Sequence, residues 1–320
     1  RYHNGYYDGG EKQFRGFQDV DSIMHGDSST ETKVETYKFD IGKLDPYRKG
    51  KLLEQSLSND KGKIYQTQVS NYALCNVEGA QATSTLTYPV KYYCLKSQET
   101  TLKEGLDAKQ WKVTRTEYVY DGYGNVIQTL TLGEKDKSGD EKYINTEYIE
   151  PNGHWFLRKP KRRVIFADPN STRRTEEKYY YDKPDFKGMP YGTLSRGNLA
   201  RTTVKVSSDK SELIERGRAK YDDFGNILEQ QDANGNRRSF EWDTDYSRFP
   251  IKESVHLGTL TLTMSVKWEL SISQIVESTS WNGHITRYKY DVFTRISGIA
   301  KPGDKLDKPT QMFVSQAMMQ

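Results

Sequence analysis

The stretch that decides the fold is KYDDFGNILEQQDANGNRRSFEWD, residues 220–243. It contains two aromatic–aspartate pairs, Tyr221-Asp222 and Trp242-Asp243, whose aspartates lie 21 residues apart (243 − 222 = 21). Gly225-Asn226 and Asn234-Gly235 supply two turns, because glycine and asparagine tolerate a positive φ. A period of this size, built from strand-like segments and tight turns, is typical of repeat proteins.

The same pattern, an aromatic residue two positions before an aromatic–aspartate pair, recurs along the chain. Positions i and i+2 of a strand point the same way, so each copy is expected to place two rings on one sheet face. The aspartate can accept from backbone N–H groups two or three residues further on and so start a turn. The residues expected to form these repeat turns and rings are Tyr120, Asp121, Gly124, Asn125, Tyr181, Asp182, Tyr221, Asp222, Gly225, Asn226, Gly235, Trp242, Asp243, Gly283, Tyr290 and Asp291.

A second type of turn, Asn-Gly, precedes two of the aromatic strands. Gly235 and Gly283 each lie eight residues before the aspartate of the next pair. Each unit is therefore expected to contain a hairpin, a strand, a second hairpin and a second strand. A single unit cannot bury its aromatic rings without stacked neighbours. One copy departs from the pattern: Asp291 is followed by Val-Phe-Thr-Arg, with Thr294 where glycine is expected, which calls the geometry of this turn into question.

Composition favours thin sheets. Only 34% of the 320 residues are hydrophobic and 29% are charged, yet the chain has 23 Tyr, 11 Phe and 5 Trp, and disordered chains are poor in aromatic residues. Aromatic and β-branched residues favour strands over helices. The net charge of +4 does not by itself indicate a nucleic-acid partner. No apolar run approaches the ~18 residues of a membrane span, so we expect a soluble fragment whose signal peptide or upstream region, if it has one, lies outside this sequence.

The predicted fold is all-β, a series of consecutive antiparallel hairpins. We expect a divergent first part with expanded repeats over residues 1–205, regular repeats over 206–304, and an irregular or truncated tail over 305–320. The best local helix candidate is Thr100–Lys112, which Gly105 and Asp107 interrupt. Cys75 and Cys94 both lie in strand-like segments, where they could form a cross-strand disulfide or be two unrelated buried thiols.

No catalytic, cofactor-binding or metal-binding site is predicted. The five histidines are widely scattered without metal-ligand spacing, and no nucleophile, phosphate-loop or dinucleotide motif occurs. Residues 136–147 partly match a calcium loop, but Glu141 replaces its glycine, so a polar hairpin loop is favoured. The basic run RKPKRR, residues 158–163, is interpreted as a solvated loop rather than a site for anionic polymers. The regular rings favour sheet packing over a carbohydrate-binding surface.

Several segments resemble one known group of proteins. Tyr-Asp-x-x-Gly-Asn, Asn-Gly-Asn and the 21-residue step resemble the YD repeats of RHS-repeat proteins. GYYDGGEKQFRGF (5–17), DTDYSRFPIKESVHLG (243–258) and WNGHITRYKYDVFTR (281–295) resemble the B component of bacterial insecticidal toxin complexes. The resemblance covers most of residues 1–304 and is loosest between 20 and 110.

This resemblance implies a fold and a role. In that family the repeats form a curved strip of a hollow β-shell, which with a C-like partner encloses a toxin domain and releases it through a pore-forming A-like component. It implies a secreted or extracellular bacterial protein that acts as a container without catalysis of its own. The family's autoproteolytic segment has no counterpart here. The alternative hypothesis is a cell-surface or secreted adhesion protein that binds carbohydrate through the same repeats.

Overall fold

The computed structural model describes residues 1–75, 92–103, 108–135, 137–151, 155–168, 174–206 and 214–314. Over these residues the chain is all-β: its regular elements are strands and two single-turn 3₁₀ segments, with no α-helix. The chain divides into two compact units, residues 1–176 with 206–211, and residues 177–205 with 212–320. The predicted all-β class is confirmed.

In the first unit, consecutive strands pair antiparallel from β1 to β10. They are β1 (Tyr2–Asp8), β2 (Gln13–Met24), β3 (Lys33–Asp40), β4 (Lys51–Asn59), β5 (Ile64–Leu74), β6 (Tyr93–Leu102), β7 (Lys112–Tyr120), β8 (Val126–Glu134), β9 (Lys142–Tyr148) and β10 (Pro160–Phe166). The 3₁₀ turns are η1 (Pro46–Arg48) and η2 (Ala108–Gln110). β11 (Arg174–Tyr181) begins in this unit and ends in the second.

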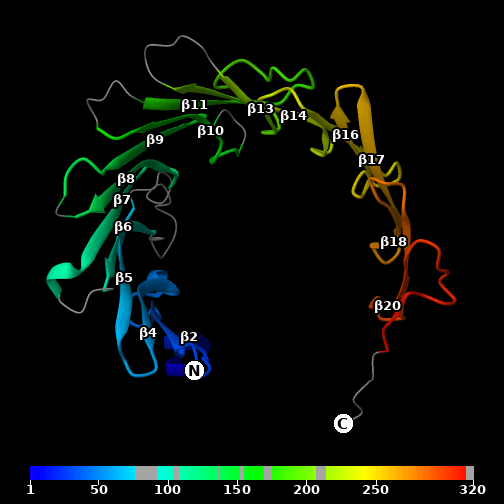
Figure 1. The fold of residues 1–320 in the computed structure, drawn as a ribbon. Coiled ribbons are helices and arrows are strands. Elements are labelled where there is room, and N and C mark those ends of the chain that lie inside the picture. The colour runs from blue at the N-terminus through cyan, green and yellow to red at the C-terminus, as the bar shows by residue number, and fades with distance from the viewer. Residues whose placement is uncertain are drawn as a thin grey trace. The chain divides into compact units, whose positions relative to one another are not determined.

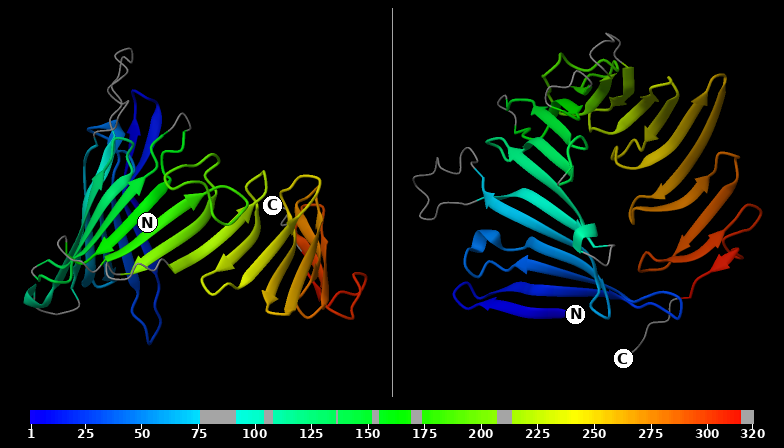
Figure 2. Two further views of the ribbon diagram at one scale, coloured as in Figure 1. Left: turned by 90° about the horizontal axis from the view of Figure 1, so that it is seen from above. Right: turned by 60° about the vertical axis from the view of Figure 1, so that its left-hand side comes forward.

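The second unit continues the same pattern of neighbouring antiparallel strands from β12 to β21. They are β12 (Leu199–Val206), β13 (Ile214–Tyr221), β14 (Ile227–Asp232), β15 (Arg237–Trp242), β16 (Pro250–Leu257), β17 (Leu260–Glu269), β18 (Gln274–Thr279), β19 (Ile285–Tyr290), β20 (Ile296–Ala300) and β21 (Gln311–Met312). Within each unit the sheet is twisted and curved, as Figures 1 and 2 show and as the right-handed twist of strands requires.

The strands form a thin sheet with very little core. Among the described residues, no large side chain is fully buried. The buried hydrophobic residues are Ile41, Ile149, Val164, Tyr181, Ala200, Ala219 and Ala300. Stability must therefore come mainly from main-chain ladders, cross-strand pairs and the turns that join the strands.

Two sequence predictions about local structure are wrong. The helix predicted over Thr100–Lys112 does not form: β6 runs to Leu102, and after the undescribed residues 104–107 the chain makes only the turn η2 before β7. Long-range pairing of Thr100 with Thr114 overrides the weak helical propensity.

The basic run 158–163 is not a solvated loop either, because Pro160–Arg163 begin strand β10. The Arg162 guanidinium donates to Glu147 on β9 and to Glu176 on β11, both at 2.7 Å. The positive charge of Arg162 is thus paired across strands of its own unit.

The final segment contains a short strand in the region predicted to be irregular. β21 pairs Gln311 with Ile299 and Met312 with Gly298. Residues 301–310 connect β20 to it, with the Thr310 hydroxyl donating to Asp304 at 2.5 Å.

Candidate functional site: the aspartate turns

The turn at residues 222–226, between β13 and β14, is built around one carboxylate. Asp222 Oδ1 accepts from the backbone N–H groups of Phe224 (2.9 Å) and Asn226 (2.8 Å), while Oδ2 accepts from the Asn226 side-chain amide (2.9 Å). The Gly225 N–H donates to the Asp222 carbonyl at φ +90°, a conformation that glycine adopts without strain. One aspartate therefore organises the entire turn.

Five other turns in the described part of the chain repeat this geometry. In each, the first residue donates its N–H to the carbonyl of the fifth, and the fourth donates to the carbonyl of the first. In each, the side chain of the first residue also accepts from the N–H of the fifth. These turns are 59–63, where Asn59 is the first residue, and 121–125, 232–236, 280–284 and 291–295.

The sequence prediction missed that the Asn-Gly turns belong to this same class. Asp232 takes the role of Asp222, and its carboxylate accepts from the Asn236 N–H. Ser280 takes the same role in the other turn, where its hydroxyl accepts from the His284 N–H at 3.2 Å. The signal was present: Asp-Ala-Asn-Gly-Asn and Ser-Trp-Asn-Gly-His both place Asp or Ser three residues before glycine. Gly235 and Gly283 accordingly have φ values of +86° and +76°.

The turn at Asp291 keeps this geometry despite its divergent sequence. Thr294 takes the glycine position with φ +61°, and its N–H still donates to the Asp291 carbonyl at 3.0 Å. Arg295 replaces the usual asparagine, and its Nε donates to Asp291 Oδ2 at 2.7 Å. The turn is preserved, but a β-branched residue occupies the left-handed region, where such residues are strained.

Thr294→Gly is therefore expected to raise the free energy of unfolding of the second unit by about 1 kcal/mol, because glycine removes the left-handed penalty. Denaturant unfolding of the variant measures this. Gly225→Thr is the reciprocal change at the equivalent position, and it should destabilise by a similar amount. Equal stability of all three chains would contradict the strain argument.

Two of the asparagines also join neighbouring loops. The Asn226 amide, already bound to Asp222, donates to the Ser247 carbonyl at 2.5 Å. Asn125 does the same with the Leu157 carbonyl at 2.6 Å. Each asparagine therefore links its turn to the next loop at the same end of the strands.

The loops after β11 and β15 are expanded versions of the same arrangement. Asp182 accepts from the N–H groups of residues 195, 196 and 197 through Oδ2 (2.6–3.1 Å) and from Asn198 through Oδ1 (2.9 Å). Asp243 accepts from the N–H groups of Tyr246, Arg248 and Phe249 (2.6–2.7 Å). We call the loops 182–198, 222–226, 243–249 and 291–295 the aspartate rim, since antiparallel alternation places them at one end of the strands of the second unit.

The ring before three of these aspartates, Asp222, Asp243 and Asp291, binds a carbonyl group of a neighbouring strand. Hydroxyl groups donate from Tyr221 to the Leu199 carbonyl (2.9 Å) and from Tyr290 to the Ile275 carbonyl (2.7 Å). Trp242 Nε1 donates to the Ile227 carbonyl at 2.9 Å. In the first unit, the Tyr120 hydroxyl donates to the Leu95 carbonyl at 2.8 Å. Tyr181 is 3% exposed, and burial raises the pKa of its hydroxyl well above 10.

The aspartates are held ionised by these turns. Burial alone raises the pKa of the Asp182 carboxyl, but its four backbone donors outweigh burial and hold the pKa below 3.8. The pKa of Asp222 is lowered in the same way, with burial opposed by hydrogen bonds from Asn226 and other turn N–H groups. These carboxylates therefore act as acceptors and are poorly suited to act as general acids.

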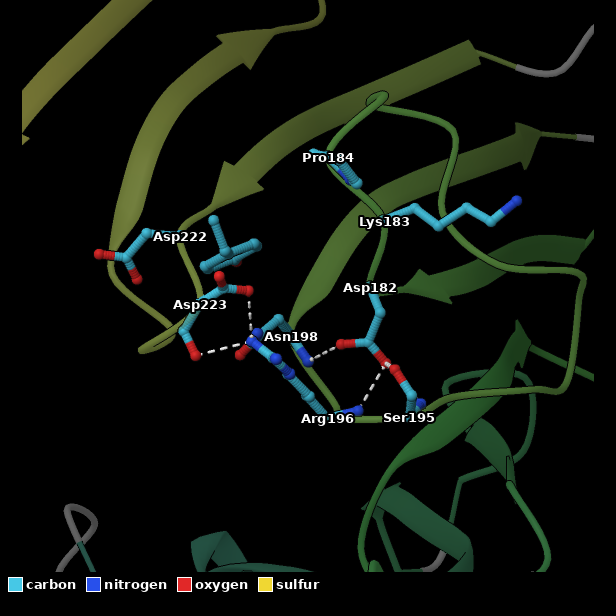
Figure 3. Close-up of a pocket in the computed structure, with 9 residues that line it drawn as sticks. Asp182, Lys183, Pro184, Ser195, Arg196, Asn198, Asp222 and Asp223 are labelled. Carbon is cyan, nitrogen blue, oxygen red and sulfur yellow. Dashed lines mark hydrogen bonds and ion pairs between the residues drawn. The ribbon is translucent and has the colours of Figure 1, made fainter.

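A concave pocket of about 410 Å³ lies between the Asp182 loop and the Asp222 turn. Figure 3 shows Arg196 reaching from the first to the second, where Nη1 donates to the Asp223 carbonyl (2.6 Å) and carboxylate (3.0 Å). Both oxygens of Asp182 are occupied by backbone donors. An ion pair braces the pocket, and the Ser195 hydroxyl, which also lines it, donates to Asp182 Oδ2 at 3.3 Å.

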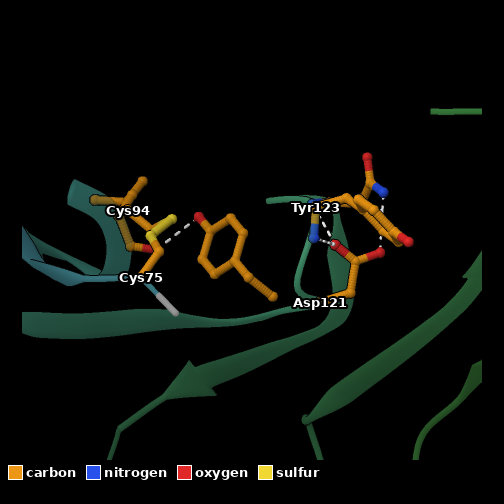
Figure 4. The surroundings of a disulfide bond; sticks show 7 residues. Cys75, Cys94, Asp121 and Tyr123 are labelled. Carbon is orange, nitrogen blue, oxygen red and sulfur yellow. Dashed lines mark hydrogen bonds between the residues drawn. A yellow bond between two sulfur atoms is a disulfide. The ribbon is translucent and has the colours of Figure 1, made fainter. Parts of the chain in front are cut away.

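Cys75 and Cys94 form a disulfide in the first unit, with their Cα atoms 5.6 Å apart. Of the two alternatives that the sequence left open, a cross-strand disulfide or two unrelated buried thiols, the structure shows the disulfide. Ala73 lies directly opposite Cys94 in the β5–β6 ladder, and the Cys75 N–H donates to the Tyr92 carbonyl at 2.8 Å. Figure 4 shows the disulfide near the Asp121 turn, where Tyr120 binds the Leu95 carbonyl next to Cys94.

The partial calcium-loop match gathers no ligand set in the described part of the chain. Asp136 lies outside the described residues, and Glu147 belongs to β9, where it binds Arg162. Across residues 1–75, 92–103, 108–135, 137–151, 155–168, 174–206 and 214–314, no group of three or more His, Cys, Asp or Glu is arranged to hold a metal ion. Over the same residues, no helix is long and apolar enough to span a membrane.

Comparison with known proteins identifies the fold through structure alone. No family profile matches the sequence, and no curated protein matches it. A crystal structure of TcdB2–TccC3 matches 98% of this chain with a TM-score of 0.61 and 16% identity. A structure of TcdB2–TccC3–TEV matches 94% with a TM-score of 0.63 and 15% identity.

A Tc holotoxin pore from Photorhabdus luminescens matches 94% of this chain with a TM-score of 0.62 and 14% identity. This chain spans only 21–22% of the length of the matched chains. It therefore shares the fold of about one fifth of a toxin-complex chain, in agreement with the resemblance seen in the sequence.

Proposed function

We propose that this chain is a wall segment of a toxin-complex shell of the B-component type. The observation that carries the proposal is the likeness of 94–98% of the chain to TcdB2–TccC3 structures. The thin sheet supports it further, because a wall needs two accessible faces rather than a packed interior. In this role the chain encloses a toxin domain and performs no catalysis of its own.

The proposed partners follow from the same role. A C-like component completes the shell around the toxin domain, and a pore-forming A-like component receives it. We further propose that the protein is secreted by a bacterium. The Cys75–Cys94 disulfide supports this location, because disulfides persist in oxidising environments.

Protease protection tests the enclosure role. The parent protein that contains this chain is produced together with its toxin-bearing partner and digested with a nonspecific protease. We expect the toxin domain to resist digestion in the complex and to be degraded when produced alone. Digestion at the same rate in both preparations would overturn the proposal.

A further inference from the structure

Four residues that carry nitrogen donors form a row across strands β12–β15 of the second unit. Residues directly opposite each other in a ladder share a face of the sheet. Arg218 lies opposite Arg201 on one side and Gln231 on the other, and Gln231 lies opposite Arg237. We call these four residues the donor row. It ends at His256, the partner of Arg237 on β16, whose two ring nitrogens already contact hydroxyl groups at 3.0 and 3.3 Å.

The cations on this face outnumber the carboxylates that pair with them. The four cations are Arg201, Arg218, Lys220 and Arg237. Glu215 is shared by the first two, and Glu229 is shared by the last two. These six side chains therefore carry a net charge of +2 (4 − 2). Arg201 and Arg218 are also directly opposite each other, where like charges repel, so a further anion would stabilise this part of the sheet.

The geometry of the donor row matches phosphate groups. Side chains directly opposite each other have Cβ atoms about 4.5–5.5 Å apart, so Arg201 and Arg218 can donate to the same oxyanion. Strands lie ~4.8 Å apart, which places Arg237 about 10 Å from Arg218, with the Gln231 amide between them. A guanidinium group presents several N–H donors in a fork that fits phosphate, and one shared carboxylate does not engage all the donors of two such groups. A short chain of phosphate groups that lies across the strands can accept from each residue of the row.

Charge and ring packing disfavour other occupants of the donor row. A second copy of this chain, related by a two-fold axis, would place the same positive row against this one, and the two would repel. Single-stranded nucleic acid binds largely by stacking its bases on available rings. Two rings beside the row are already engaged by its cations, since the Arg201 guanidinium lies 4.1 Å from the Tyr180 ring centroid and Lys220 Nζ lies 4.1 Å from that of Phe186. A phosphate chain needs no free ring.

We propose that the donor row binds a short chain of phosphate groups. Arg201 and Arg218 hold one end of the chain, Arg237 holds the other, and the Gln231 amide donates between them. The row is open to such a ligand, because the Arg218 side chain is 37% exposed and the Arg237 side chain is 51% exposed. The inference goes beyond the enclosure role and does not depend on it, since it uses only the register and the charges of β12–β15.

Isothermal titration calorimetry with sodium tripolyphosphate, at constant ionic strength, tests the proposal on this chain. Arg237→Gln should weaken binding about tenfold, because hydrogen bonds to charged groups contribute at least this factor. Arg238→Gln is the matched control and should leave binding unchanged. It removes the same charge one residue away, on the opposite face. Arg238 is 52% exposed, against 51% for Arg237, and it also pairs with a glutamate, Glu253 at 3.0 Å.

Glu215→Gln guards against loss of fold, because this variant should bind tripolyphosphate more tightly. The change removes the carboxylate that competes with the ligand for Arg201 and Arg218. An exposed ion pair is worth up to about 1 kcal/mol, so the dissociation constant should fall roughly threefold. A misfolded chain would lose binding instead, so a gain identifies the row itself.

Four results would overturn the proposal. The first is that the wild type does not bind tripolyphosphate. The second is equal weakening by Arg237→Gln and Arg238→Gln, because binding would then follow overall charge. The third is equally tight binding of polyglutamate with the same number of charges, since the row would then not select phosphate. The fourth is tighter binding of an oligothymidylate with the same number of charges, which would assign the row to single-stranded nucleic acid.

Discussion

Asp182→Ala is expected to release the loop from Lys183 to Gly197 and to lower the free energy of unfolding of the second unit by about 3–5 kcal/mol. The carboxylate accepts four backbone N–H groups, and hydrogen bonds to a charged group contribute about 1.5–3 kcal/mol each without full additivity. Alanine would also strain the backbone at φ +54°. Hydrogen exchange at residues 195–198 and denaturant unfolding measure the two effects.

Asp182→Asn separates charge from backbone strain, because asparagine tolerates the left-handed region. Asp182→Asn should retain part of the loop's protection from hydrogen exchange. Its free energy of unfolding should lie between those of the wild type and Asp182→Ala. Asp223→Ala is the surface control, because the Asp223 side chain is 91% exposed. Within the pocket, its carboxylate forms an ion pair with Arg196. Its effect should stay below about 1 kcal/mol. A loop that remains protected in Asp182→Ala would show that other contacts hold it.

The same carboxylates predict how stability depends on pH. The folded-state pKa values of Asp182 and Asp222 lie below their unfolded value of about 3.8. Their contribution is therefore fully present above pH 4 and is lost as the pH falls through the folded pKa values. We expect the second unit to lose stability below pH 4, and Asp182→Ala to show a shallower loss.

Replacing both cysteines by serine is the second large change. Cys75 and Cys94 are 19 residues apart, and opening a loop of this length costs about 3 kcal/mol in the chain-entropy account of disulfides. The first unit should unfold at a lower denaturant concentration, with faster hydrogen exchange where β5 meets β6. Reduction of the wild type by dithiothreitol should reproduce the effect.

The second unit supplies the control for the disulfide. It contains neither cysteine, so hydrogen exchange in β16 and β17 should stay the same in the double serine variant. Nearest-neighbour coupling in a repeat sheet limits the damage to adjacent strands. A uniform loss of protection across both units would instead indicate that the chain unfolds as one cooperative block.

Local patterns in the sequence are sufficient to predict the strands and many of the turns. The hairpin around Asp121 and that around Asp222 follow from alternation, aspartate and glycine within about 20 residues. The roles of Asp232 and Ser280 are easily missed, because the conspicuous Asn-Gly pair hides the acceptor three residues before the glycine. The turn at Thr294, whose geometry the sequence called into question, keeps the common geometry because the hydrogen bonds around Asp291 outweigh one strained residue.

Other features depend on contacts that no local pattern contains. The strand through Thr100 forms because β5 and β7 pair with it on both sides. The basic run forms part of β10 because Glu147 and Glu176 lie on the two neighbouring strands. Which residues of neighbouring strands share a side of the sheet emerges only from the register, since alternation within one strand does not reveal it.

The closing hydrogen bond of the aspartate rim is independent of loop length. Asp222 N–H donates to the carbonyl of Asn226 four residues on, and Asp182 N–H makes the same bond to Asn198, sixteen residues on. The two strands that flank each loop are therefore joined at the loop's first and last residues in the same way, whatever sequence lies between these two residues. Such junctions are natural places for evolution or an engineer to insert new segments, since an added loop alters neither the strand register nor the neighbouring strands.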